Sequence, residues 1–256
     1  MWKVVRITVL LLVLLIVAGQ ALDDRLSTTS WQRTIYAGAF PVAADDSPVT
    51  AQYLAQLEQS DIEEVASFLN SEAKRYGVGL DEPLVLKLYP TLAKAPPALE
   101  RDAGVLTRIV WSLKLRYYRR QVMAGVSPRP KIALFLMYHD PARNQTLPHS
   151  LGLQRGLSAV VHLFASPEQA SQDQIIIAHE LLHTFGAKDA YDPATGQPLV
   201  ARGLADPQRD PLYPQQQAEI MAGRMPLSAT ESRLPEGLDE EVVGAETARE
   251  IGWIRR

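Results

Sequence analysis

Two histidines and a glutamate lie together in the stretch QIIIAHELLHTFGAKDAYD, residues 174–192, and these residue types can bind and use a metal ion. In a helix, His179 and His183 would share one face because they are four residues apart. That arrangement brings two imidazole nitrogens to one zinc ion at about 2.0–2.1 Å. Glu180 would lie beside the ion, where it could take a proton from a water whose pKa zinc lowers to about 7. The spacing therefore predicts a hydrolytic zinc site.

A catalytic zinc ion needs a third protein ligand and one open position, and Asp189 is the candidate for that ligand. Gly186 can adopt the left-handed backbone that ends a helix and turns the chain sharply. Asp189 follows three residues later, so we expect its carboxylate to swing back toward the two histidines. Glu219 is a rival that ranks below Asp189, because no convincing helix surrounds it. Thiolate ligands and disulfides are excluded, because the chain has no cysteine.

The stretch HELLHTFGAKD resembles the zinc signature of the metzincin metallopeptidases, with two histidines, a glycine and a third ligand at the same spacings. Most metzincins have histidine as the third ligand, and a minority, the snapalysin-like enzymes, have aspartate. Metzincins also have a methionine turn beneath the metal. By this resemblance Met221, in QAEIMAGRMP, would form the floor of the site, and Met225 is the weaker candidate.

The resemblance has further implications. Some metzincins have a tyrosine two residues after the turn methionine, where this sequence has Gly223. Tyr191 and Tyr213 lie in the loop after the motif and could take that role. In metzincins, a sheet strand beside the active-site helix usually binds the substrate as an added strand, and LSAVVHLF, residues 157–164, stands where that strand would be. The remaining histidines are interpreted as structural residues that form hydrogen bonds: His139, His149 and His162.

The elements that must position this site alternate along the chain. Strands are predicted at 31–40, 83–90, 131–139 and 157–166, and helices at 60–76, at 99–121, from 166 into the motif, and weakly at 239–251. We expect a capping box at Ser60 and Glu63, and a connection at 41–48. The order predicts a mixed sheet with helices packed on it, in an α+β or α/β arrangement, and we expect α+β. The resemblance implies a metzincin-like, twisted mixed sheet with an active-site helix and a helical C-terminal part.

The helix at 99–121 has an apolar face and a basic end. Its apolar residues at helical spacing are Leu106, Ile109, Val110, Leu113 and Tyr117. The basic cluster is Lys114, Arg116, Arg119 and Arg120. We interpret the cluster as a solvated helix end that complements the negative end of the helix dipole. The alternative is contact with anionic lipid headgroups near an N-terminal anchor.

The N-terminus has the three parts of an export signal. Lys3 and Arg6 precede an apolar run from Ile7 to Ala18, and small residues lead to an expected cleavage point after Ala21. The run is short for a membrane span, which needs about 20 residues, but an uncleaved anchor formed by residues 4–22 is the alternative. Either interpretation places residues 23–256, as a single zinc metallopeptidase-like domain, in the periplasm or outside the cell. Membrane contact is expected through the N-terminal segment.

Composition limits the choice of function. Hydrophobic residues make up 46% and charged residues 21% of the 256 residues, which favours a packed globular core. The net charge of −3 gives no electrostatic reason for binding nucleic acid. We therefore expect a Zn²⁺-dependent peptidase, an endopeptidase, that acts on peptides or proteins. The alternatives are a non-catalytic zinc-stabilised domain that binds a partner at the cell envelope, and an amidase acting on cell-wall or other non-peptide amides.

Overall fold

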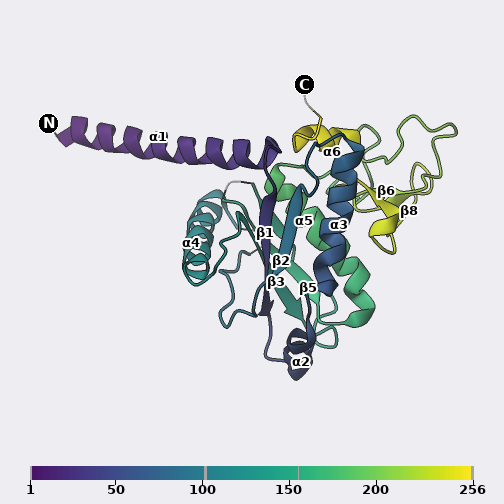
Figure 1. Ribbon diagram of the computed structural model, residues 1–256, viewed down its shortest axis with the longest axis horizontal. Helices are drawn as coiled ribbons and strands as arrows, with labels where there is room; N and C mark the ends of the chain where they lie inside the picture. The colour runs from purple at the N-terminus through teal and green to yellow at the C-terminus, as the bar shows by residue number, and fades with distance from the viewer. Residues whose placement is uncertain (1, 101–102, 155, 255–256) are drawn as a thin grey trace.

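A mixed five-stranded sheet organises the protein in a computed structural model that describes residues 2–100, 103–154 and 156–254 (Figure 1). The strands are β1 (Ile35–Ala43), β2 (Leu84–Leu88), β3 (Ile132–His139), β4 (Leu151–Leu153) and β5 (Ser158–Phe164). Their order across the sheet is β2-β1-β3-β5-β4. The first four strands in this order run parallel, and β4 pairs antiparallel with β5 at one edge. The predicted α+β class with a mixed sheet is confirmed.

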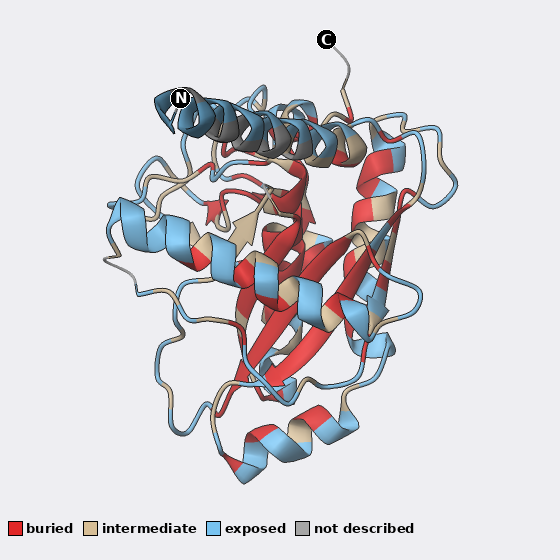
Figure 2. Ribbon diagram, turned by 90° about the vertical axis from the view of Figure 1, so that its left-hand side faces the viewer, coloured by how far each residue is buried: buried red, intermediate tan, exposed pale blue. Residues whose placement is uncertain are grey.

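The central strand β3, predicted at 131–139, is buried along its whole length. Its side chains alternate between two apolar cores. Leu134 and Leu136 face the core beneath α3 and α5, while Ala133 and Phe135 face the core beneath α4. Figure 2 shows the strands as the most continuously buried part of the fold. Burial on both faces explains why the strand is almost wholly apolar.

Helices cover both faces of this sheet (Figure 1). They are α2 (Pro48–Gln56), α3 (Ser60–Arg75), α4 (Val105–Ala124) and α5 (Ala170–Phe185). In α3 the residues Ile62, Val65 and Leu69 are buried as predicted, and Gly77 follows the helix with a φ of 77°. The predicted capping box is wrong. Ser60 is already inside the helix, and a carboxylate oxygen of Asp61 accepts the backbone N–H of residue 58 instead.

Other boundaries also differ from the sequence-based predictions. The segment 41–48 is not simply a connection, because β1 continues to Ala43 and α2 begins at Pro48. Strand β4 was not predicted, since its three residues are too few to show a periodicity. The C-terminal part is less helical than expected. Within the described residues after α5, its helices are the 3-10 turn Leu238–Glu240 and α6 (Ala245–Glu250).

Short paired strands connect separate segments of the C-terminal part with one another. They are β6 (Ala218–Glu219), β7 (Met225–Pro226), β8 (Ser232–Arg233) and β9 (Glu241–Val242). Strand β6 pairs parallel with β9, and β7 pairs antiparallel with β8. These pairs hold the loop that carries Met221 against the end of α5.

Helix α4 begins later than predicted. It packs on the sheet with the side opposite to the predicted one. It begins at Val105, and residues 101 and 102 of the predicted range lie outside the described residues. Trp111, Leu115 and Tyr118 pack on the sheet, whereas all five apolar residues of the predicted face are exposed. The prediction of the packing face was wrong because α4 is apolar on two opposite sides, and periodicity cannot tell which side meets the sheet.

Helix α1 (Trp2–Thr29) extends from the rest of the fold (Figure 1). It passes through Ala21 without a break. Trp31, just beyond its end, donates a hydrogen bond to the carbonyl oxygen of Ile251 and packs edge-on against Phe185. Among the residues that were described and searched, no helix combines the length and the apolar character needed to cross a membrane.

Candidate metal centre

The last turns of α5 carry the two histidines, and Gly186 ends the helix as predicted. Gly186 has a φ of 106°, in the left-handed region that favours glycine. The backbone N–H groups of Gly186 and Ala187 donate to the carbonyl oxygens of His183 and Leu182, which closes the helix end. The chain therefore reverses directly after the motif and brings Asp189 back toward α5.

Three side chains converge at this reversal. One carboxylate oxygen of Asp189, Oδ1, lies 3.2 Å from Nε2 of His179 and 3.2 Å from Nε2 of His183. The two imidazole rings are 4.7 Å apart between centroids and nearly perpendicular. The structure thus brings together all three residues that the sequence analysis selected as ligands. The imidazoles are 16% exposed and the Asp189 side chain 42%, so the cluster is open to solvent on one side.

The other nitrogen of each imidazole is engaged by a backbone carbonyl. His179 Nδ1 lies 2.9 Å from the carbonyl oxygen of Ile220, and His183 Nδ1 lies 2.8 Å from that of Ala187. A carbonyl oxygen only accepts hydrogen bonds, so each Nδ1 must carry the proton. In the neutral imidazoles, both Nε2 atoms therefore present lone pairs toward the carboxylate of Asp189.

This arrangement of acceptors fits a cation. Two nitrogen lone pairs that each lie 3.2 Å from the same carboxylate oxygen repel it unless a shared positive charge stabilises them. Ligands of a tetrahedral zinc ion lie about 3.3 Å apart when the zinc–ligand distance is about 2.05 Å. The measured separations are close to that value. Without a metal, only protonation of the imidazoles would supply the charge.

The pKa values of the cluster reflect the same contacts. Burial acts to raise the pKa of Asp189, but its hydrogen bonds to His179 and His183 outweigh burial and lower it. Burial disfavours the charged form of His183, but the contact with Asp189 and the negative charge of Glu180 raise its pKa overall. The carboxylate is thus held ionised, in the form that binds a metal.

Glu180 lies next to the histidines but is buried. One of its carboxylate oxygens is within 4.8 Å of a nitrogen of each histidine, so His179, Glu180 and His183 form a group that could hold a metal ion. Its Oε2 atom has no hydrogen-bond partner among the described residues. Burial raises the pKa of Glu180, although the nearby histidines oppose this. A buried carboxylate with a raised pKa beside a metal-binding cluster is poised to accept and donate protons.

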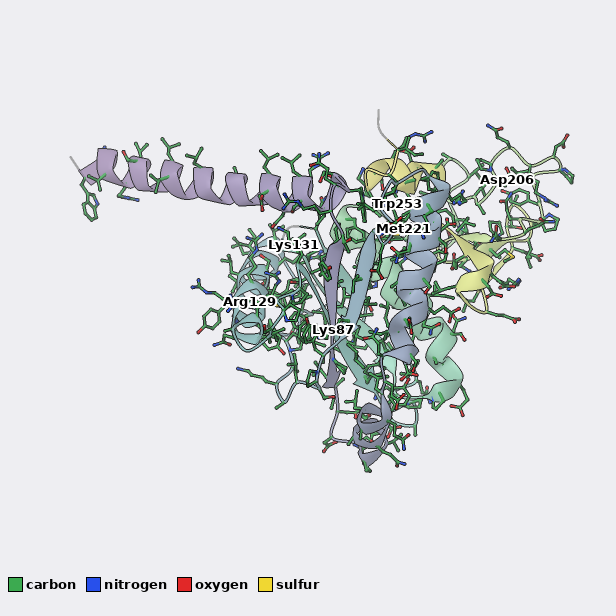
Figure 3. The ribbon with its side chains drawn as sticks, in the orientation of Figure 1. Lys87, Arg129, Lys131, Asp206, Met221 and Trp253 are labelled. Carbon is green, nitrogen blue, oxygen red and sulfur yellow. The ribbon has the colours of Figure 1, made fainter. Side chains whose placement is uncertain are left out.

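The turn that contains Met221 contacts the cluster through its backbone, and Met221 itself is fully buried; in the view of Figure 3 it is labelled close to Trp253. Its carbonyl oxygen accepts the backbone N–H of Ala190, the neighbour of Asp189. The preceding residue, Ile220, supplies the carbonyl that orients His179. Met225, the weaker candidate for this place, belongs to β7 instead.

Glu219 does not face the histidines as a ligand. Its Oε2 accepts the backbone N–H groups of Met221 and Ala222, and its Oε1 accepts that of Gly244 and the hydroxyl of Thr247. Four donors occupy the carboxylate, which is fully buried. Glu219 therefore holds the turn in shape. The sequence analysis considered it only as a rival ligand and missed this role.

The sequence analysis also missed edge strand β4. This strand, and not the segment expected to bind the substrate, lies at the edge of the sheet. The predicted segment 157–164 is β5, an interior strand, and β4 is the edge strand beside α5. A Cβ atom at Gly152 would lie 2.5 Å from Cβ of His183 and 2.6 Å from the carbonyl oxygen of Glu180. Glycine at 152 therefore lets the strand approach the cluster. The pair of glycines around 152–156 was the only signal in the sequence.

The two loop tyrosines are placed differently. The hydroxyl of Tyr191 hydrogen-bonds to Asp189, and burial together with the charges of Asp189 and Glu180 raises the pKa of Tyr191. Tyr213 has no contact with the cluster in any described interaction. Of these two tyrosines, Tyr191 is therefore the one that interacts with a candidate ligand.

The other histidines lie on the α4 side of the sheet. His139 Nε2 and His162 Nδ1 are 2.8 Å apart, which confirms a hydrogen-bonding role for both. Burial lowers the pKa of His162 to about 4, so it is neutral at pH 7. His149 lines an adjacent apolar cavity of about 500 Å³ with Trp111 and Leu151. None of the lining residues belongs to the metal cluster.

Comparisons with known proteins do not identify the chain: no protein-family model matches it, and no curated protein does. The functional argument therefore depends on the geometry of the cluster.

Proposed function

We propose that the protein is a zinc-dependent metallopeptidase of the metzincin type that hydrolyses peptide bonds outside the cytoplasm. The observation that carries this proposal is the convergence of Asp189 Oδ1 on both histidine Nε2 atoms, 3.2 Å from each, beside the unpartnered buried carboxylate of Glu180. A purely structural zinc site would have no use for that carboxylate and would close its fourth position.

His179, His183 and Asp189 would hold the zinc ion. Asp189 suits the third position better than Glu180, because its oxygen is equidistant from the two nitrogens and its side chain is partly open to solvent. When bound, zinc would polarise the peptide carbonyl and make a water more acidic. Glu180 takes the proton of the attacking water and passes it to the nitrogen of the leaving amine. Burial raises the pKa of Glu180, which favours its uptake of a proton from the water.

The substrate would extend along β4. The edge of β4 that faces away from β5 pairs with no other strand among the described residues, so its backbone groups can bind an extended peptide. Gly152 brings this edge within contact of His183 and Glu180. A peptide added there would present a carbonyl group close to the cluster. A peptide bound in extended form along a strand fits an endopeptidase, which cleaves within a chain.

Zinc analysis and peptidase assays of matched variants test the proposal. The parent protein should bind one zinc ion per chain and cleave an unfolded protein, and a chelator should abolish cleavage. Glu180→Gln should retain the zinc ion and lose at least about 100-fold in activity. Cleavage at the parent rate by Glu180→Gln would show that the base is assigned wrongly. Zinc binding without cleavage of any peptide or cell-wall amide by the parent would favour a non-catalytic binding domain.

A further inference from the structure

Helix α4 carries an apolar surface that nothing in the described structure covers. Its exposed apolar side chains are 50% to 78% accessible. They define the outer face of α4: Val105, Leu106, Ile109, Val110, Leu113 and Tyr117. Trp111 and Leu115, on the opposite side of the helix, are buried against the sheet. Isolated exposed apolar residues are common, but a stripe along more than three turns of one helix is typical of a binding surface.

The segment that carries this face has charge of one sign. The segment 105–131 contains seven of the chain's 26 basic residues and none of its 29 acidic residues, although the whole chain is negative. Lys114 and Arg120 are exposed on α4 itself. Arg129 and Lys131 lie beside α4 and below α1 (Figure 3). A partner for this surface therefore combines apolar groups with negative charge.

A groove beside α4 combines the two properties. It has a volume of about 530 Å³ and runs between the helix and the segment around Lys94. Val110, Leu113 and Tyr117 form its apolar wall, and Lys94 and Lys114 line it as well. An apolar channel flanked by two ammonium groups fits an acyl chain below an anionic headgroup.

The direction of α1 identifies the partner. Helix α1 leaves the fold on the side that α4 covers, and its amino-terminal part extends past α4 (Figure 1). Viewed from that side, α1 points toward the reader while α4 lies across the fold with its exposed residues outward (Figure 2). Trp2, Leu11 and Leu15 of α1 are all exposed. One plane parallel to α4 would therefore meet the apolar part of α1 and the outer face of α4 together.

Contacts at the base of α1 hold this orientation. Asp23 lies 3.5 Å from Lys131, and Asp24 accepts the backbone N–H of Gly156. Arg119 of α4 donates to the carbonyl oxygen of Lys131. The base of α1, the segment 129–131 and α4 are thus joined through direct contacts.

We propose that the outer face of α4 lies in the headgroup region of an anionic phospholipid membrane, and that the amino-terminal part of α1 enters the same membrane from the same side. The apolar residues of α4 would be buried among the upper acyl chains, and Lys114 and Arg120 would bind lipid phosphates. The peptidase domain would then have a fixed orientation on the membrane instead of hanging from a flexible tether.

The absence of cysteine allows a direct test. Val110→Cys places a single cysteine on the outer face of α4, at a residue that is 50% exposed. Leu234→Cys, just after β8, is the control, because Leu234 is 55% exposed. Each full-length variant is labelled with an environment-sensitive fluorophore and reconstituted with vesicles. We expect a blue shift at position 110 and none at 234. The shift should be larger with phosphatidylglycerol vesicles than with phosphatidylcholine vesicles, and it should decrease at high salt.

A charge-matched pair of variants provides the second measurement. Ile109→Glu with Leu113→Glu should remove the blue shift of a label at 110, because both carboxylates would face the membrane. Val200→Glu with Leu227→Glu adds the same charge elsewhere and should preserve the blue shift of the label at 110. All four positions are exposed, so we expect unchanged thermal unfolding. Equal emission at 110 and 234 on vesicles would overturn the proposal. A shift at 110 that grows with protein concentration without vesicles would overturn it in favour of a second copy of the chain.

Discussion

His179 Nδ1 lies 2.9 Å from the carbonyl oxygen of Ile220, so the turn around Met221 orients a side chain of the metal centre from 41 residues away. This contact sets the tautomer of His179 and directs its Nε2 atom toward Asp189. The shape of this loop around Met221 depends on Glu219. The metal centre is therefore supported by a carboxylate that makes no contact with the candidate ligands.

Glu219→Gln should disturb the metal centre through this turn. An amide would place an NH₂ group against two of the four donors that the carboxylate now accepts. We expect a loss of about 2–4 kcal/mol in the free energy of unfolding and about 10-fold to 100-fold weaker zinc binding. Chemical denaturation and zinc titration would measure the two effects. Thr247→Val, which removes one donor only, should cost about 1 kcal/mol and leave zinc affinity unchanged.

Asp189→Ala should remove the third ligand. We expect zinc affinity to fall by at least about 100-fold, because only two imidazoles remain. Loss of a residue that merely hydrogen-bonds to a metal ligand already costs about 10-fold to 100-fold. Zinc content after dialysis measures this, with Glu180→Gln as the variant that retains zinc. An Asp189→Ala protein that kept a full equivalent of zinc would place the third ligand elsewhere.

Tyr191→Phe should weaken zinc binding by about 10-fold, because it removes the hydroxyl that hydrogen-bonds to the carboxylate of Asp189. Peptidase activity should return to near the parent value at saturating zinc. The measurement is a zinc titration of activity. Activity that stays low at saturating zinc would contradict this and would indicate that the hydroxyl contacts the substrate.

Gly152→Ala should force β4 away from α5. The new Cβ would lie 2.5 Å from the Cβ atom of His183 and 2.6 Å from the carbonyl oxygen of Glu180, and backbone cannot yield as a flexible side chain can. We expect a loss of about 1–3 kcal/mol in stability and a rise in KM, because the edge strand shifts. At Gly79 an added Cβ meets nothing within 4 Å, so Gly79→Ala should change neither quantity.

Because two carboxyl groups are buried, we expect the free energy of unfolding to fall at high pH. Burial raises the pKa of Glu241 to about 9, with the negative charges of Glu219 and Glu240 adding to the effect, and burial raises the pKa of Asp173 to about 8. In the unfolded chain both groups ionise near their ordinary values of 4.5 and 3.8. The folded state therefore binds more protons than the unfolded state between these values, and the free energy of unfolding decreases as pH rises through that window.

Glu241→Gln isolates one of these groups. The amide has nearly the shape of the protonated acid and cannot ionise, so the variant should match the parent at pH 5 and be more stable at pH 9. Thermal unfolding across this range measures the difference. Parallel curves for the two proteins would show that Glu241 does not titrate as the structure indicates.

Much of the metal cluster followed from local sequence. The spacing of His179 and His183 determines a shared face because helix geometry is local, and Gly186 determines where the helix can end. Asp189 is close enough along the chain for that turn to direct it back. The positions of β1, β2, β3 and β5 along the chain also followed, since apolar runs such as β3 show where a buried strand lies.

Tertiary packing decided the rest, because it joins residues that no local pattern connects. Nothing in the local sequence shows that Glu219 holds the turn under His179, or that Gly152 lies against His183. The side of α4 that meets the sheet was also undetermined, because both sides are apolar and only the shape of the core selects Trp111 and Leu115. Periodicity reports that a face is apolar; the assembled sheet decides whether that face is buried or left for a partner.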